Sequence, residues 1–137
     1  MTIEGDPGCR LCKLNQYTDN VCEMGFGRND ADVMVVSRMP NSRTYQEMIE
    51  AELMSAGVPL ERTYFTSVVK CRSFDADPGK KDLKVCTETY LDAEIAAIKP
   101  KFILGFGNEA LAALTPHSGI MKWRGRVEEI NGAQVVA

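Results

Sequence analysis

Short apolar runs alternate with longer segments of helical spacing along most of the chain. Residues 32–36 open after polar residues and are strongly apolar, which is typical of a buried strand. Residues 44–56 repeat apolar side chains at helical spacing and stop at Gly57, as an amphipathic helix does. Such patterns predict strands over 32–36, 64–69 and 102–107, helices over 44–56, 81–98 and 108–114, and two further strands over 126–130 and 133–136.

The alternation of strands and helices predicts an α/β fold. Connections of this kind give a mostly parallel sheet that is covered by helices on both faces. Ligands bind such sheets beyond the carboxyl ends of the strands. We therefore expect the loops after Val36, Val69 and Phe106 to face one crevice. No linker or repeat divides the 137 residues, so a single domain over 1–137 is expected.

Composition limits the location and the partners of the protein. Hydrophobic residues make up 45% and charged residues 26%, which is typical of a chain that folds. No secretory signal opens the chain and no apolar run is as long as a membrane span, so we expect a cytoplasmic protein with no membrane partner. The net charge of −3 excludes a strongly basic nucleic-acid binder but allows a local basic stripe.

Four of the five cysteines have the spacing of metal ligands. Cys9 and Cys12 form a C-x-x-C pair near the start, and Cys71 and Cys86 follow much later. In a reducing compartment such thiols indicate a metal site more readily than disulfides. Zinc and an iron–sulfur cluster both stay open, although ligands from a terminal segment, a strand end and a helix favour a bulky cluster. Cys22 is the spare cysteine and is predicted to be a core residue.

Several segments, in this order, carry a resemblance to a known family. They are Cys-Arg-Leu-Cys at 9–12, Asp-Ala-Asp-Val-Met-Val-Val at 30–36, Thr-Ser-Val-Val-Lys-Cys-Arg at 66–72, Cys86, Ile-Lys-Pro-Lys-Phe-Ile-Leu-Gly-Phe-Gly at 98–107, and Arg-Gly at 124–125. Over most of its length the chain resembles the iron–sulfur uracil-DNA glycosylases, families 4 and 5 of that superfamily. The resemblance implies a three-layer α/β/α sandwich with a short sheet of about four strands. It also implies a 4Fe–4S cluster at Cys9, Cys12, Cys71 and Cys86, with zinc as the alternative.

The chain departs from the family at the catalytic motifs. The family's first motif, Gly-Glu-x-Pro-Gly, is replaced by 37–41, where Arg38 puts a cation in the place of the acid. The segment that supplies a stacking ring looks deleted, and Ser67 stands where the family has a base-reading asparagine. The family's His-Pro motif would lie beyond Ala137, and His117 is predicted to be a solvated surface group. These departures predict a degenerate or truncated member without catalytic residues.

The expected function is therefore binding rather than excision. We expect a DNA-binding protein, accessory to replication or repair, that contacts nucleic acid or a protein of such a complex. An active uracil-DNA glycosylase and a structural subunit that docks proteins are the alternatives. Trp123 either stacks on DNA or packs the last strand. The predicted nucleic-acid-binding residues are Arg38, Asn41, Ser67, Lys70, Arg72, Lys122 and Arg124.

Overall fold

A six-stranded, mostly parallel sheet forms the centre of the protein. The computed structural model describes residues 5–18, 21–73, 77–117, 119–130 and 132–136. The strands lie in the order β1-β3-β2-β4-β6-β5, and the four inner strands are parallel while β1 and β5 pair antiparallel at the two edges. Their bounds are β1 (Phe26–Gly27), β2 (Val33–Ser37), β3 (Thr63–Ser67), β4 (Phe102–Gly105), β5 (Val127–Ile130) and β6 (Ala133–Val136).

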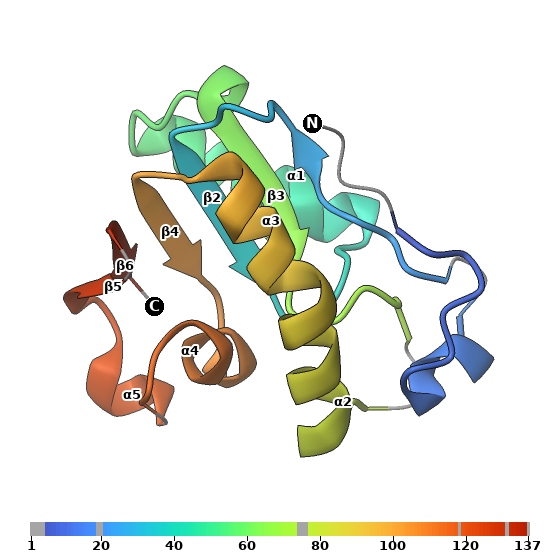
Figure 1. The fold of residues 1–137 in the computed structure, drawn as a ribbon. Coiled ribbons are helices and arrows are strands. Elements are labelled where there is room, and N and C mark those ends of the chain that lie inside the picture. Colours follow the sequence, from blue (N-terminus) through green and yellow to red (C-terminus); the bar gives the residue numbers. More distant parts are fainter. Residues whose placement is uncertain (1–4, 19–20, 74–76, 118, 131, 137) are drawn as a thin grey trace.

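Helices cover both faces of this sheet, which confirms the predicted sandwich (Figure 1). The α-helices are α1 (Arg43–Ser55), α2 (Lys80–Cys86), α3 (Asp92–Ile98), α4 (Asn108–Leu114) and α5 (Ile120–Trp123). Three short helical turns accompany them: η1 (Lys13–Gln16), η2 (Leu60–Arg62) and the π-helical η3 (Thr87–Leu91). The six strands are two more than the four that the resemblance implies. The sequence pattern predicts five of them, and it misses β1 because this edge strand is only two residues long.

The alternation of side chains along β2 divides the core into two layers. Val35 faces α1 and packs with Ile49 and Leu53. Its neighbours Met34 and Val36 face the opposite layer, which α3 and α4 cover. Successive residues of a strand point to opposite faces, so one apolar run can fill both layers.

A third apolar cluster ties the N-terminal segment to the rest of the molecule. Leu14 of η1 is fully buried and packs with Val69, Cys71 and Cys86. The predicted helix over 81–98 is a continuous helical run made of α2, η3 and α3. The π turn inside it follows Cys86 directly, and a hydrophobic repeat does not reveal such an insertion.

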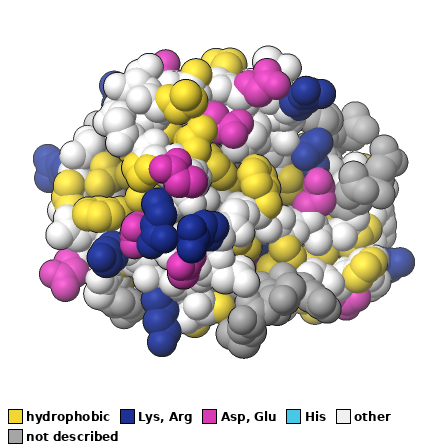
Figure 2. All heavy atoms as spheres, turned by 90° about the horizontal axis from the view of Figure 1, so that it is seen from above, with side chains coloured by type: hydrophobic (Ala, Val, Ile, Leu, Met, Phe, Trp, Pro, Cys, Tyr) yellow, Lys and Arg dark blue, Asp and Glu magenta, His cyan; other side chains and the backbone are white. Residues whose placement is uncertain are grey.

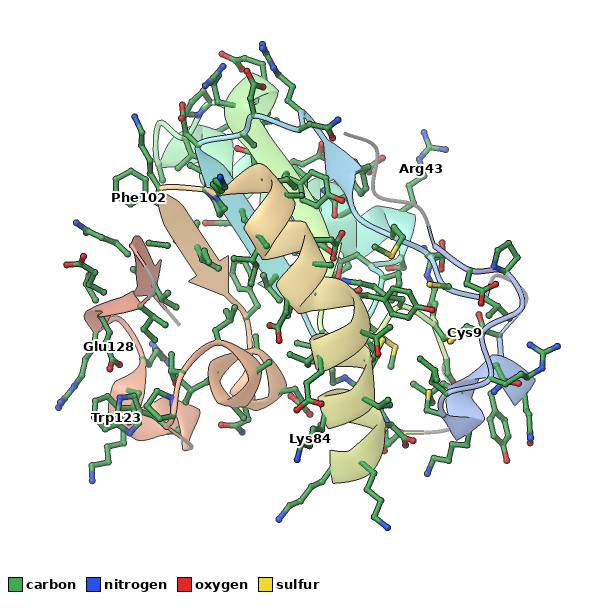
Figure 3. All side chains as sticks on the ribbon, in the orientation of Figure 1. Cys9, Arg43, Lys84, Phe102, Trp123 and Glu128 are labelled. Atoms are coloured by element: carbon green, nitrogen blue, oxygen red, sulfur yellow. The ribbon has the colours of Figure 1, made fainter. Side chains whose placement is uncertain are left out.

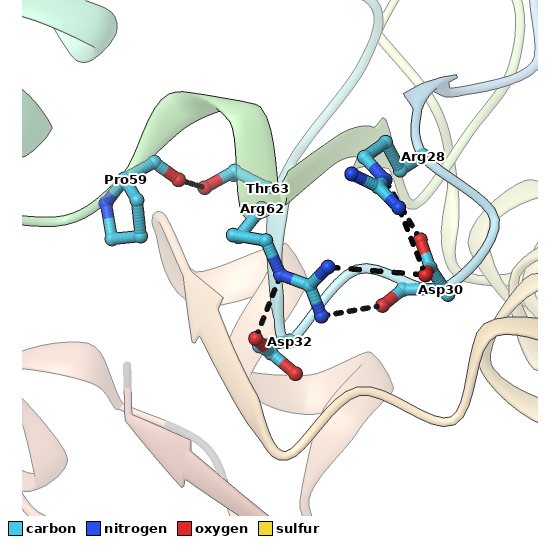
Figure 4. A network of polar contacts seen from close by, with 6 residues as sticks. All are labelled: Arg28, Asp30, Asp32, Pro59, Arg62 and Thr63. Carbon is cyan, nitrogen blue, oxygen red and sulfur yellow. Dashed lines mark hydrogen bonds and ion pairs between the residues drawn. The ribbon is translucent and has the colours of Figure 1, made fainter.

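An ion-pair network fixes the beginnings of β2 and β3 (Figure 4). The Arg62 Nε lies 3.0 Å from an Asp32 carboxylate oxygen, and Arg28 forms a second pair with Asp30. The hydrogen bond from Arg62 holds the pKa of Asp32 below its ordinary value. Figure 2 shows this end of the molecule, where basic and acidic side chains lie interleaved.

In the part of the chain that the structure describes, no helix has the length and apolar character needed to cross a membrane.

Candidate metal centre and nucleic-acid interface

All five cysteines line one small cavity between the N-terminal segment and the core. Cys9 and Cys12 come from the segment before η1, Cys71 from the turn after β3, and Cys86 from the end of α2. The structure therefore brings together the four predicted ligands, and it adds Cys22 to them. All five are free thiols, and the void between the side chains is only about 10 Å³.

The cavity is apolar, which matters for the protonation of its thiols. Burial raises the pKa of the Cys12 and Cys71 thiols, and it raises the pKa of Cys86 to about 12. A metal ligand must be a thiolate, so ligation here requires a positive centre that compensates for the missing solvent. A thiol set of this number and type fits an iron–sulfur cluster or zinc.

The arrangement of the thiols bears on the group that they could hold. Among the described residues, no three cysteine, histidine or acidic side chains are grouped closely enough to hold a single metal ion. Four sulfurs around one zinc ion lie about 3.8 Å apart, given a Zn–S bond of about 2.3 Å. The void of about 10 Å³ does not hold a cubane cluster with the side chains as they lie, so a cluster would require the thiols to lie further apart.

A buried ion pair lies directly beside this cavity. The Lys70 ammonium is 2.6 Å from a Glu94 carboxylate oxygen, and both side chains are essentially inaccessible to solvent. Burial lowers the pKa of Lys70, while the charge of Glu94 opposes that change. The prediction that Lys70 contacts nucleic acid is therefore wrong. Its nearness to Arg72 in the sequence suggested an exposed basic segment, but Lys70 is buried in the turn after β3.

Glu94 is the centre of a polar network that sequence reasoning missed. Its carboxylate accepts hydrogen bonds from the Tyr64 hydroxyl at 2.7 Å, the Thr66 hydroxyl at 2.7 Å and the Gly25 amide at 3.0 Å. One signal was available: Glu94 stands on the helical face of the apolar residues Leu91 and Ile98. A charge on such a face must be paired when it is buried.

The loops after β2 and β4 enclose a groove of about 500 Å³ at the carboxyl ends of these strands, and we call it the main groove. Tyr45 and Phe106 expose their rings along it, and Glu109 of α4 adds a carboxylate. The turn after β3 is tied to the same loop, because the Val68 amide donates to the Ser37 carbonyl at 2.8 Å. The expected crevice is therefore present for the loops after β2 and β4, whereas the segment after Val69 does not line it.

Two further polar side chains of this groove come from the end of β2 and the loop after it. The buried Ser37 hydroxyl has no hydrogen-bond partner among the described residues. The Arg38 guanidinium lies 3.0 Å from the exposed Asp77 carboxylate, in the loop where the family motif has an acid. A surface pair of this kind is weak, so Arg38 remains available to a phosphate.

Asn41, Ser67 and Arg72 come together at a second, smaller pocket of about 90 Å³, with Phe26 and Phe65 among its walls. The Ser67 hydroxyl donates to the Val69 carbonyl at 2.5 Å, and the Asn41 amide donates to Gln46. These polar groups are thus used within the protein.

Arg72 is held at the same pocket. Its guanidinium donates to the Pro40 carbonyl at 3.2 Å and to Glu23 at 3.4 Å. The second carboxylate oxygen of Glu23 and the amide nitrogen of Gln46 are buried and have no partner in the described part of the chain. Neither residue was predicted, because neither belongs to a recognisable motif.

Lys122 and Arg124 lie apart from these pockets, in and after α5, and both are exposed. Trp123 between them packs against the protein: the His117 ring stacks on it at 3.6 Å, and the Arg126 guanidinium lies 5.2 Å from the ring centre. Figure 3 shows Trp123 and Glu128 close together. His117 is hydrogen-bonded to Glu128 at 2.7 Å, so the prediction of a solvated surface histidine is wrong.

Comparison with known proteins identifies the family. The sequence model described as the uracil DNA glycosylase superfamily matches residues 24–136. A type-4 uracil-DNA glycosylase of Sulfurisphaera tokodaii is 30% identical over 114 residues, which cover 74% of this chain and 51% of that protein. The corresponding protein of Archaeoglobus fulgidus is 27% identical over 113 residues, which cover 74% of this chain and 56% of that protein.

A relative of another kind covers more of the chain. A DNA polymerase of Bacillus phage SP01 is 30% identical over 137 residues, which cover 91% of this chain but only 15% of the polymerase. The chain spans about half the length of the type-4 relatives. The family match, together with the sheet order and the grouped cysteines, leads to one conclusion: the chain belongs to the uracil DNA glycosylase superfamily.

Proposed function

We propose that the chain is an iron–sulfur, DNA-binding member of the superfamily that does not excise uracil and that serves replication or repair as an accessory. The observation that carries this proposal is the polarity of the main groove. Its loop presents Arg38 where cleavage of a glycosidic bond calls for a negative charge. A guanidinium there raises the energy of a cationic sugar in the transition state.

The smaller pocket also supports binding without excision. Recognition of a flipped base relies on hydrogen bonds to its Watson–Crick edge. Ser67 offers a single hydroxyl, and that hydroxyl donates to the Val69 carbonyl. The Asn41 amide is likewise bound to Gln46. The pocket therefore has to break internal hydrogen bonds before these groups can contact a base.

The proposed cofactor is a 4Fe–4S cluster held by Cys9, Cys12, Cys71 and Cys86. The support is the thiol set around one cavity and the similarity to type-4 enzymes. When bound, the cluster supplies a covalent link between the N-terminal segment and the core. The residues themselves hold that segment through the packing of Leu14.

DNA contact is proposed through exposed cations at the end of the molecule where the parallel strands finish. Arg38 lies at the main groove, and Lys122 and Arg124 lie in and after α5. Lys84 of α2 reaches the same end, at the bottom of Figure 3. Contacts of this kind position a duplex through its phosphates and carry no sequence information.

A role beside a polymerase is supported by the phage relative. That protein is named a DNA polymerase, and its similarity extends over more of this chain than that of the type-4 enzymes. We propose that the module holds DNA for a replication enzyme, within one polypeptide or as a partner.

The test combines excision with binding. Iron-loaded protein is incubated with single-stranded and duplex oligonucleotides that contain uracil, and abasic products are measured after alkaline cleavage. We expect no excision above the buffer control, together with salt-dependent binding of the same oligonucleotides. Excision at a catalytic rate would contradict the inactive assignment, and loss of all binding at low salt would contradict the DNA-binding role.

Glu109 favours a second candidate, an active glycosylase. This carboxylate lines the main groove from α4 and could replace the acid that the β2 loop lacks. Glu109→Gln separates the candidates: an active enzyme would lose its excision with this change, whereas the binding module would keep its affinity for DNA.

A further inference from the structure

We propose that Cys22 is a fifth thiol of the cluster site and can replace Cys9 as a ligand. This inference rests on the cluster of the proposed function and extends the ligand set beyond the four cysteines that the sequence pattern indicates. Its basis is the position of Cys22 relative to the cavity, to Tyr90 and to Cys71.

Cys22 lies inside the cluster cavity. Its side chain lines the same void as the four predicted ligands, and the residue is only 7% exposed. Its backbone amide points to the sulfur of Cys71, at 3.5 Å. The Cys22 thiol contacts the Met24 sulfur at 3.9 Å, and the other four thiols line the same cavity.

The size of the cavity places Cys22 near Cys9. Both side chains, together with Tyr90, line a void of only about 10 Å³. Side chains around a void of this size lie close to each other. A cluster corner that Cys9 can reach is therefore within reach of Cys22.

The backbone holds Cys22 more firmly than Cys9. Cys22 has a φ of 59°, a left-handed conformation that is uncommon outside glycine. Such a conformation persists where the surroundings over-determine it. The bond to Cys71 and the hydrogen bond from the Glu23 amide to the Lys70 carbonyl supply that restraint. Cys9 is half-buried in the terminal segment, and its amide donates to the nearby Asp6 carbonyl.

The exchange would be a ligand substitution without electron transfer. With Cys9 absent, the Cys22 thiol would lose its proton to solvent, and its sulfur would hold the cluster in the place of Cys9. Four thiolates would then still hold the cluster. The chain thus carries one reserve ligand, on a part of the backbone that is independent of the terminal segment.

Iron and sulfide content test this directly. The wild type, Cys9→Ala, Cys22→Ala, the double variant and Cys86→Ala are reconstituted with iron and sulfide, and their visible absorption is recorded. Alanine is used because a serine oxygen can itself bind iron. We expect both single variants at Cys9 and Cys22 to retain the iron content of the wild type. The double variant and Cys86→Ala should lose it.

The outcomes separate the two proposals. If Cys9→Ala loses its iron while the wild type keeps it, Cys22 does not act as a reserve ligand. The proposal of a cluster in the wild type is then unaffected. A wild type that binds no iron and no sulfide overturns both. Far-UV circular dichroism of each variant detects unfolding, and iron retained by the double variant would also refute the role of Cys22.

Discussion

At the scale of single residues, the pair of Lys70 and Glu94 stands out because both of its charged side chains are buried. Both charges are fully buried, and each has further hydrogen bonds, Lys70 to Thr66 and Glu94 to Tyr64. A buried pair contributes little net stability compared with apolar residues, but removal of one partner leaves the other charge unpaired.

Glu94→Gln should therefore destabilise the protein by about 3–5 kcal/mol, because the Lys70 ammonium loses its counter-charge. Urea denaturation measures the change in the free energy of unfolding. The double variant Lys70→Met/Glu94→Leu is the control, since it removes both charges. It should be more stable than Glu94→Gln, and equal destabilisation of the two would contradict the ion pair.

The ion pair of Arg62 and Asp32 gives a prediction about pH. Its hydrogen bond lowers the pKa of Asp32 from 3.8, so Arg62→Ala should return it toward that value. A carboxyl with a lowered pKa stabilises the fold above its unfolded pKa and loses that contribution as the pH falls through the folded pKa. The stability difference between wild type and variant should thus shrink in acid. Carbon NMR of the Asp32 carboxyl measures the pKa, and an unchanged value would refute the interaction.

Residue identity alone could predict the four thiols but not the direction of every side chain. Cys9, Cys12, Cys71 and Cys86 meet at one cavity, as their spacing suggested. Lys70 was assigned wrongly because the sequence of a basic segment is the same whether a given lysine side chain is exposed or buried. Burial is a property of the turn after β3, and no local pattern encodes it.

At the scale of elements, the strands and helices of the parallel core and the edge strand β5 agree with the sequence pattern, whereas the edge strand β1 and the short helix α5 do not. The helix over 108–114 has the predicted bounds, and β2 differs from the predicted strand by one residue at each end. β1 and α5 were not predicted, since each is held by contacts with distant parts of the chain and too short for a periodic signal.

β1 depends on a close approach of the backbone at Gly25. A Cβ atom there would overlap the Tyr64 ring and lie 2.5 Å from the Phe65 carbonyl oxygen. Gly25→Ala should therefore displace β1 from β3 and cost about 1–3 kcal/mol in thermal or urea unfolding. Gly79→Ala is the matched control, because its nearest contact would be an ordinary 3.5 Å. Similar effects of both changes would contradict the close packing.

At the scale of the whole molecule, the two ends of the sheet differ in charge. The end where β2 and β3 begin carries paired charges, and the opposite end carries the exposed Lys122 and Arg124. The overall charge of −3 therefore coexists with exposed cations at this end of the sheet. Sequence composition could not reveal this arrangement, because it depends on which end each cation occupies.

Removal of Lys122 and Arg124 should weaken DNA binding without changing stability. Each phosphate contact that is lost should reduce the slope of log K against log salt by about 0.9 for a duplex. Fluorescence anisotropy over a series of salt concentrations measures that slope. Lys101→Ala, an exposed lysine just before β4, is the control at the other end. A larger loss of affinity in Lys101→Ala than in the Lys122 and Arg124 variant would place the DNA at the end where β4 begins, and would contradict the proposed interface.

The cluster proposal predicts a local response to iron removal. Chelation should release the segment 5–18, while the core around β2 and β3 stays folded. Without iron, this segment is anchored only by the packing of Leu14 and the long ion pair of Lys13 with Asp82, as far as the described residues show. Limited proteolysis with mass spectrometry reads this out, with cleavage expected in the segment after chelation. Cleavage that is identical with and without iron would contradict a cluster in this place.

The two antiparallel edge strands described above also protect the sheet from association with other chains. β1 offers only two residues for pairing, and β5 carries the charged Glu128 and Glu129 on its short length. Short edges and charged side chains discourage the addition of a foreign strand. The parallel centre, which folds through long-range contacts, is thereby shielded from edge-to-edge aggregation.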